Sequence, residues 1–88
     1  MISVITPVRN TNPYLDTYIR AMLDQTDRDF ELIVVDDGST DGVDRVLEER
    51  LKSVPRLQVI RQAPSGILTA TMNGIRHCSG EYVAFVDS

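Results

Sequence analysis

The sequence predicts a single α/β domain, a three-layer α/β/α arrangement built on a parallel βαβαβαβ sheet. Short runs rich in β-branched residues alternate with longer stretches whose apolar residues recur at three- and four-residue steps. The longer stretches would supply the helical crossovers, which in such sheets are right-handed. One run, residues 32–35, is apolar without interruption, as expected for a strand that is buried on both faces.

Length and composition limit the possible functions. A chain of 88 residues allows one domain with a small core. It is 42% hydrophobic and 25% charged, which is typical of a globular domain rather than a disordered one. The net charge of -4 and the scattered Lys and Arg residues argue against nucleic acid as a partner.

The sequence also bears on location. No stretch approaches the roughly 20 apolar residues of a membrane span, and Met1 is followed directly by strand-like sequence without a charged leader. The single Cys78 has no partner for an internal disulfide, which fits a reducing compartment. We therefore expect a cytoplasmic protein, with peripheral attachment of the full-length protein to a membrane left open.

The first strand and helix follow from the first 23 residues. The apolar run at residues 2–5 predicts a strand that stops at Thr6 and Pro7, because proline cannot donate to a central hydrogen-bond ladder. Asn12 followed by Pro13 marks the start of a helix. The apolar face of this helix would consist of Leu15, Tyr18, Ile19, Met22 and Leu23.

Two carboxylates follow the central strand. Residues 30–41 read FELIVVDDGSTD, so Asp36 and Asp37 stand at the carboxyl end of that strand. Ligands of open α/β sheets bind at this end, in the crevice where the strand order reverses. Spacing alone leaves two interpretations open: the carboxylates cap the following turn and helix, or they hold a ligand.

The second half of the chain repeats the pattern. Residues 43–51 have the apolar spacing of a helix, and residues 57–61 predict a third strand. A loop with proline and glycine then leads to a third helix at residues 67–78, whose small residues would allow close packing. Its expected inner face comprises Ile67, Ala70, Thr71, Gly74, Ile75 and Cys78. Residues 81–86 predict a fourth strand that runs into Asp87.

The chemistry of the strand ends is acidic. A glycine-rich dinucleotide fingerprint, a phosphate-binding P-loop and Cys/His spacing for zinc are all missing from the sequence. If the first, second and fourth strands are neighbours, Thr6, Pro7, Asp36, Asp37 and Asp87 converge on one crevice. Carboxylates there can accept hydrogen bonds from a base or a ribose, or bind Mg²⁺ or Mn²⁺ beside a diphosphate.

Three motifs in register resemble the family 2 glycosyltransferases of the GT-A fold. They are residues 3–10 (SVITPVRN), residues 30–41 and residues 80–88 (GEYVAFVDS), so the resemblance extends over the whole chain. It implies a Rossmann-like sheet with strand order 3-2-1-4, the N-terminal half of the GT-A fold. Residues 1–88 would then form one partial domain, the half that binds the nucleotide sugar, with the acceptor half absent.

The resemblance also implies an activity and roles for residues. Members transfer a sugar from a UDP-, GDP- or dTDP-sugar to a sugar, lipid-linked or protein acceptor, as in the synthesis of cell envelope polysaccharides. We expect an inverting, metal-dependent reaction in the intact enzyme. Thr6 and Pro7 would line the nucleoside pocket, and Asp37 would accept a hydrogen bond from the base with Asp36 nearby. Asp87 would open the acidic motif that holds Mn²⁺ or Mg²⁺ on the diphosphate.

Two departures from the family pattern qualify the expectation. Thr71 and Met72 stand where members often carry Arg-Asn or Leu-Asn, and Asn73 comes one residue late, so no donor contact is assigned to this helix. The remaining aspartates and the catalytic base lie, in the family, beyond Ser88. We therefore assign no catalytic residue and expect an inactive fragment. The alternative function is a non-catalytic module that binds a nucleotide or a protein.

The fourth strand predicts self-association. In the whole fold later strands would cover it, so in this chain it would be an open, apolar edge. Because the core is also small, we expect a homodimer or a higher homo-oligomer formed through this edge.

Overall fold

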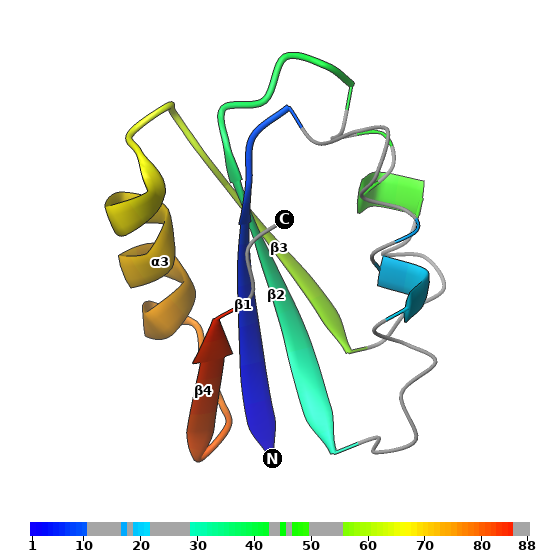
Figure 1. Cartoon of the computed structure of the whole chain (residues 1–88), viewed down its shortest axis with the longest axis vertical. Coiled ribbons are helices and arrows are strands. Elements are labelled where there is room, and N and C mark those ends of the chain that lie inside the picture. The colour runs from blue at the N-terminus through cyan, green and yellow to red at the C-terminus, as the bar shows by residue number, and fades with distance from the viewer. Residues whose placement is uncertain are drawn as a thin grey trace.

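The computed structural model is built on one parallel sheet, and it describes residues 1–10, 17, 19–21, 29–42, 45, 47–49 and 56–85. The strands are β1 (Ile2–Val8), β2 (Phe30–Asp37), β3 (Leu57–Gln62) and β4 (Tyr82–Phe85), and α3 (Ile67–Arg76) is the helix that joins β3 to β4. The strands lie in the order β3-β2-β1-β4, and every neighbouring pair is parallel (Figure 1). The predicted parallel sheet with strand order 3-2-1-4 is therefore confirmed.

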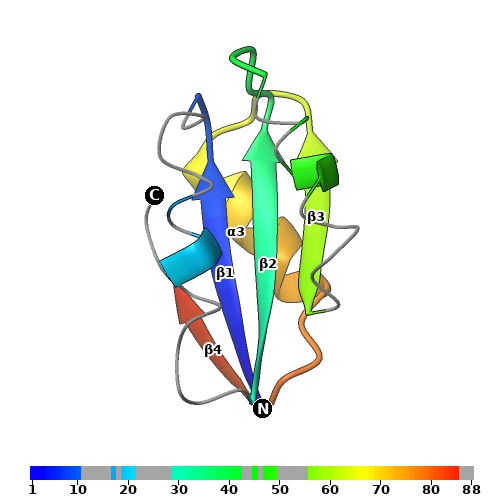
Figure 2. The same ribbon diagram turned by 90° about the vertical axis from the view of Figure 1, so that its right-hand side faces the viewer.

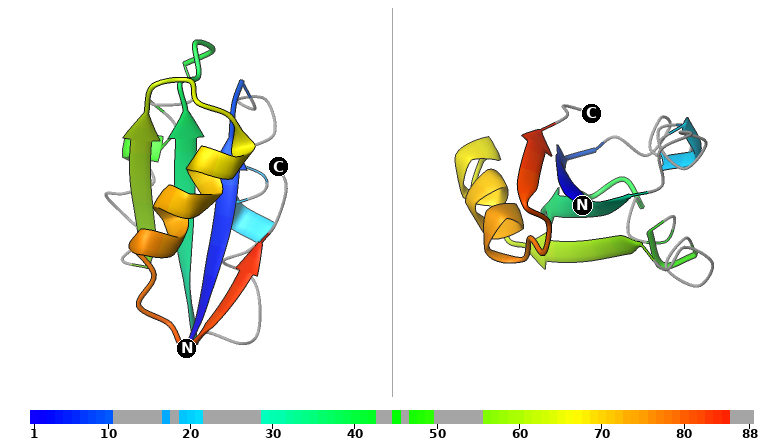
Figure 3. Two further views of the ribbon diagram at one scale, coloured as in Figure 1. Left: turned by 90° about the vertical axis from the view of Figure 1, so that its left-hand side faces the viewer. Right: turned by 90° about the horizontal axis from the view of Figure 1, so that it is seen from below.

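Helical segments cover both faces of the sheet. Figure 2 shows short helical pieces, which include residues 19–21 and 47–49, in front of the sheet, and Figure 3 shows α3 lying across the opposite face. Ile19 and Leu47 from these pieces are fully buried, as the helical spacing predicts. The rest of the first two predicted helices lies outside the described residues.

Each face of the sheet has its own core. On the side away from α3 the cluster consists of Val4, Val8, Ile19, Phe30, Leu32, Val34, Leu47 and Leu57. On the α3 side it consists of Ile5, Ile33, Val35 and Ala70. Alternate residues of β2 thus enter opposite cores, which explains why the run at residues 32–35 has no polar position.

The first strand is longer than predicted. We expected it to stop at Thr6 and Pro7, but β1 continues through Pro7 to Val8, and Pro7 lies opposite Val35 of β2. Within the described residues, the pairing of β1 with β4 extends from Ile2 opposite Tyr82 to Ile5 opposite Phe85. The prediction of an early end was wrong, because proline removes one N–H donor from the ladder but its fixed φ is still compatible with extended backbone.

The third helix packs closely on the sheet. A Cβ atom added at Gly74 would lie 2.5 Å from Cγ2 of Ile5, so the small residues do permit close packing as predicted. The contact is narrower than predicted, however, because Ala70 and Gly74 are buried whereas Ile67 and Ile75 are 62% and 42% exposed. Because the backbone of α3 at Gly74 lies directly against the sheet, the longer side chains of the helix lie to the sides of this contact and stay partly exposed.

The fourth strand leaves apolar side chains at the surface. Tyr82, Val83 and Phe85 are 68%, 41% and 56% exposed. Of the described strands only β1 pairs with β4 (Figure 1). The predicted apolar character of this edge is therefore present, while Val86 and Asp87 lie outside the described residues.

Candidate functional site

The carboxyl ends of β1, β2 and β3 meet at one edge of the sheet. Val8 lies opposite Asp36, and Asp37 lies opposite Gln62. Figure 1 shows the loops that follow these strands at the same end of the molecule. The structure thus brings the end of the strand that carries Thr6 and Pro7 next to the end of the strand that carries the two carboxylates, and it adds the end of β3, which the sequence analysis did not include.

Asp37 is a buried carboxylate that holds the loop after β3. Its Oδ1 accepts hydrogen bonds from Nε2 of Gln62 at 2.9 Å and from the backbone N–H of Ser65 at 2.7 Å, and its Oδ2 accepts one from the N–H of Gly66 at 3.0 Å. The Gln62 bond, followed by the Ser65 bond, lowers the pKa of Asp37 despite the opposing effect of burial. Asp37 is therefore ionised at neutral pH and accepts hydrogen bonds only.

Asp36 has a different environment because successive side chains of a strand point to opposite faces. Its Oδ1 accepts a hydrogen bond from the N–H of Ser39 at 3.0 Å, the pattern of an Asx turn. Asp36 is 4% exposed and closes its own turn, whereas Asp37 connects distant segments. The capping interpretation thus describes Asp36, and its predicted place beside the nucleotide stays a prediction.

The loops after the three strands are joined to one another. Asn10 has a φ of 54°, a left-handed conformation that Asn tolerates, and its Oδ1 accepts a hydrogen bond from the N–H of Thr40 at 2.9 Å. The N–H of Asn10 in turn donates to Oγ of Ser39 at 3.0 Å. Gly38 has a φ of 71°, and a Cβ there would lie 2.3 Å from Cγ of Pro64. These contacts give the carboxyl edge a connected, preorganised backbone.

A side chain of α3 reaches Asp37 through a second residue. Nδ2 of Asn73 donates to Oε1 of Gln62, whose Nε2 donates to Asp37. Sequence reasoning noted Asn73 but assigned it no role, and it missed Gln62, Ser65 and Gly66. The predicted strand order was a usable signal, because it places the end of β3 next to the end of β2.

The other site residues predicted from the sequence are Thr6, Pro7 and Asp87. Thr6 is fully buried and Pro7 is half-buried, and their roles at a nucleoside stay predictions. Arg9 is exposed, and its positive charge contributes to the lowered pKa of Asp37. Asp87 lies outside the described residues.

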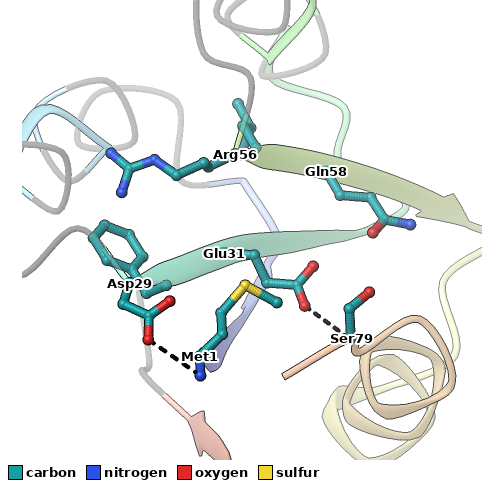
Figure 4. A pocket seen from close by; sticks show the side chains of 8 residues that line it. Met1, Asp29, Glu31, Arg56, Gln58 and Ser79 are labelled. Carbon is teal, nitrogen blue, oxygen red and sulfur yellow. Dashed lines mark hydrogen bonds and ion pairs between the residues drawn. The ribbon is translucent and has the colours of Figure 1, made fainter. Parts of the chain in front are cut away.

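A hollow of about 460 Å³ lies at the opposite, amino edge of the sheet (Figure 4). It is lined by Met1, Asp29, Phe30, Glu31, Arg56, Leu57, Gln58 and Ser79. Two contacts join residues of its lining: the amino group of Met1 lies 3.3 Å from Oδ2 of Asp29, and Oε2 of Glu31 accepts a hydrogen bond from the N–H of Ser79. We place the candidate site at the carboxyl edge, where sheets of this type bind ligands.

The part of the chain that the structure describes lacks two features. Its residues include no group of three or more His, Cys, Asp or Glu side chains that could hold a metal ion. The same residues include no helix that is long and apolar enough to cross a membrane.

The sequence is similar to bacterial glycosyltransferases. It is 37% identical over 87 residues to the uncharacterized glycosyltransferase EpsJ of Bacillus subtilis, which covers 99% of this chain and 25% of EpsJ. It is 35% identical over 88 residues to the chondroitin synthase of Escherichia coli, which covers 100% of this chain and 13% of the synthase. The chain thus spans a quarter or less of the length of these two relatives.

Solved structures of glycosyltransferases share the fold. The mannosyltransferase PcManGT of Pyrobaculum calidifontis, in complex with GDP-Man and Mn²⁺, superposes with a TM-score of 0.90 at 28% identity, over 98% of this chain and 26% of PcManGT. Residues 1–349 of TarS from S. aureus, in complex with UDP-GlcNAc, superpose with a TM-score of 0.89 at 30% identity, over 98% of this chain and 26% of that one. The sheet is therefore that of the GT-A glycosyltransferases.

The model of the family described as "Glycosyl transferase family 2" matches residues 3–88. This match contains all three motifs from which the resemblance was drawn. The chain belongs to glycosyltransferase family 2.

Proposed function

We propose that this chain binds the nucleotide of a nucleotide-diphosphate sugar, as the donor-binding part of an enzyme that transfers the sugar to an acceptor. Family membership supports the reaction class, and the complexes of PcManGT with GDP-Man and of TarS with UDP-GlcNAc support the donor class. A relative in Bacillus subtilis named "Putative teichuronic acid biosynthesis glycosyltransferase TuaG", 37% identical over 89 residues that cover 35% of TuaG, supports a role in cell envelope polysaccharide synthesis. The acceptor would be a sugar, a lipid-linked saccharide or a protein.

The observation that carries the proposal is the Asp37 carboxylate at the carboxyl edge. It is ionised, it is held from three directions, and ionised carboxylates accept hydrogen bonds without donating any. Such a group suits a base that presents a ring N–H, as uracil, thymine and guanine do. Thr6 and Pro7 would line the nucleoside pocket beside it, with Asp36 supporting the loop.

The metal is a further part of the proposal. PcManGT is bound to Mn²⁺, and we propose that Asp87 contributes to the binding of Mn²⁺ or Mg²⁺ at the donor diphosphate. The described residues do not form a metal site by themselves. A divalent cation would stabilise the charge of the leaving diphosphate in an inverting displacement. Among residues 1–88 we assign no catalytic base.

Isothermal titration of the 88-residue chain with UDP, GDP and dTDP, each with Mn²⁺, tests the proposal. We expect heat from at least one of them and none from CDP, because the cytosine ring lacks the N–H that Asp37 would bind. The Asp37→Asn variant should lose this preference. No heat from any of the three nucleotides would overturn the proposal and favour a module that binds protein.

We propose, in addition, that copies of this chain associate through β4. The support is the run of exposed apolar side chains on β4, which pairs with β1 alone among the described strands. Sedimentation velocity over a range of concentrations tests this, and a monomer at the highest concentration would exclude it. We also propose a cytoplasmic location, which the free thiol of Cys78 supports.

A further inference from the structure

Gln62 connects Asp37 to the helix α3. Its Nε2 lies 2.9 Å from Oδ1 of Asp37, and its Oε1 accepts a hydrogen bond from Nδ2 of Asn73. Gln62 and Asn73 are both half-buried, so water competes for these bonds only in part. The three side chains come from β2, β3 and α3, which are joined here by side-chain hydrogen bonds.

The direction of these bonds follows from the chemistry of the groups. An ionised carboxylate only accepts, so Gln62 must present its NH₂ group to Asp37. The carbonyl of the same amide then faces Asn73, which must also present NH₂. Flipping either amide, so that its oxygen and its NH₂ group exchange places, would bring two oxygens into contact.

We propose that Gln62 and Asn73 are positioning residues that orient the Asp37 carboxylate for the base of the nucleotide. The proposal rests on the proposed function, because it concerns how the same site recognises its donor. Neither residue touches the base in this proposal. Asn73 holds the amide of Gln62 in one orientation, and Gln62 then keeps one oxygen of Asp37 engaged, which leaves the remaining acceptor positions of the carboxylate at a defined place.

The lowered pKa of Asp37 agrees with this arrangement, since the Gln62 hydrogen bond is its largest cause. The network also gives α3 a connection to the site. The family pattern offered none, because Thr71 and Met72 stand where members often carry an Asn-containing pair. Asn73 makes this connection through Gln62, without being at the position expected from that pattern.

Reversing the polarity of Asn73 tests the proposal. In Asn73→Asp the new carboxylate accepts only, so Gln62 faces two acceptors and can satisfy one of them. We expect the pKa of Asp37, followed by ¹³C NMR of its carboxyl carbon, to rise, and the affinity for UDP with Mn²⁺ to fall about tenfold. Thr69→Asp places the same charge at an exposed position of α3 and should change neither quantity.

The decisive comparison introduces Asn73→Asp into a Gln62→Leu variant. In this double variant no amide at position 62 can link residue 73 to Asp37. We expect Asn73→Asp to have little further effect there. An equal rise of the Asp37 pKa in both backgrounds would mean that the new charge acts directly, and it would overturn the proposal. The carboxyl titration needs no nucleotide. A wild-type chain that fails to bind UDP, GDP or dTDP would therefore refute the proposed function separately, while unchanged titration and affinity in Asn73→Asp would refute the positioning role alone.

Discussion

At the scale of single residues, two adjacent aspartates with similar burial have different roles. Asp36 is 4% and Asp37 is 5% exposed. Asp36 bonds to Ser39, three residues away, whereas Asp37 bonds to Gln62, Ser65 and Gly66, at least 25 residues away. The alternation of side chains along β2 is the physical cause, because it directs Asp37 to the face of α3 and the loop before it.

Asp37→Asn should destabilise the fold. The amide has one acceptor oxygen, and its NH₂ group would face backbone N–H donors at Ser65 or Gly66. We expect a loss of about 1–3 kcal/mol in the free energy of unfolding at pH 7, measured by urea denaturation. Glu81→Gln, at an exposed position, is the matched control and should leave this free energy unchanged.

The same variant should change the acid dependence of stability. The pKa of Asp37 is lower in the folded chain than its unfolded value of about 3.9, so its contribution is complete above that value and decreases as the pH falls through the folded pKa. The difference between wild type and Asp37→Asn should therefore shrink below about pH 4. A difference that stays constant on acidification would contradict the assigned hydrogen bonds.

At the scale of elements, the contact of α3 with β1 depends on Gly74. Gly74→Ala improves helix propensity by about 1 kcal/mol, but its Cβ would lie 2.5 Å from Cγ2 of Ile5, and overpacking of this kind costs about 1–3 kcal/mol. We expect a net decrease in the free energy of unfolding. Thr69→Ala, on the exposed side of α3, changes helix propensity without creating a clash. This variant should not decrease the free energy of unfolding. A stabilised Gly74→Ala would show that α3 can move away from β1.

The turn between α3 and β4 is held by a buried serine at the amino edge. Oγ of Ser3 donates to Oε2 of Glu31 at 2.6 Å and accepts from the N–H of Gly80 at 2.9 Å. Ser3→Ala would leave that N–H without this acceptor, and we expect a loss of about 1–3 kcal/mol in thermal or urea unfolding. Ser79→Ala is the control, because Ser79 contributes its backbone N–H to Glu31. Equal effects of the two variants would contradict this account.

At the scale of the whole molecule, we expect the exposed side chains of β4 to mediate the proposed self-association. Phe85 is 56% exposed, and a lysine there would place a charge on an apolar strand edge. We expect Phe85→Lys to shift the chain toward the monomer in sedimentation velocity. Leu68→Lys, at a 74% exposed position of α3, is the control and should leave the distribution unchanged. If Leu68→Lys alone produced monomers, the interface would lie on the helix.

The fold and part of the site followed from the sequence because they depend on local patterns. The apolar run at residues 32–35, the helical spacing that placed Ile19 and Leu47 in the core, and the small residues 70 and 74 are properties of short segments. Alternating strands and helices then imply a parallel sheet, since parallel strands need crossovers. Family resemblance supplied the strand order, which places the carboxyl ends of β1 and β2 side by side.

Tertiary structure alone decided what depends on segments distant in sequence. Pro7 remains in β1, opposite Val35 of β2, and Ile67 and Ile75 stay exposed because α3 approaches through Gly74. The partners of Asp37 are 25 to 29 residues away, and no spacing rule relates them to it. Sequence patterns determined which residues reach the carboxyl edge. Only the packing of β3 and α3 against β2 decided which donors the carboxylate meets there, because a hydrogen bond depends on distance and direction.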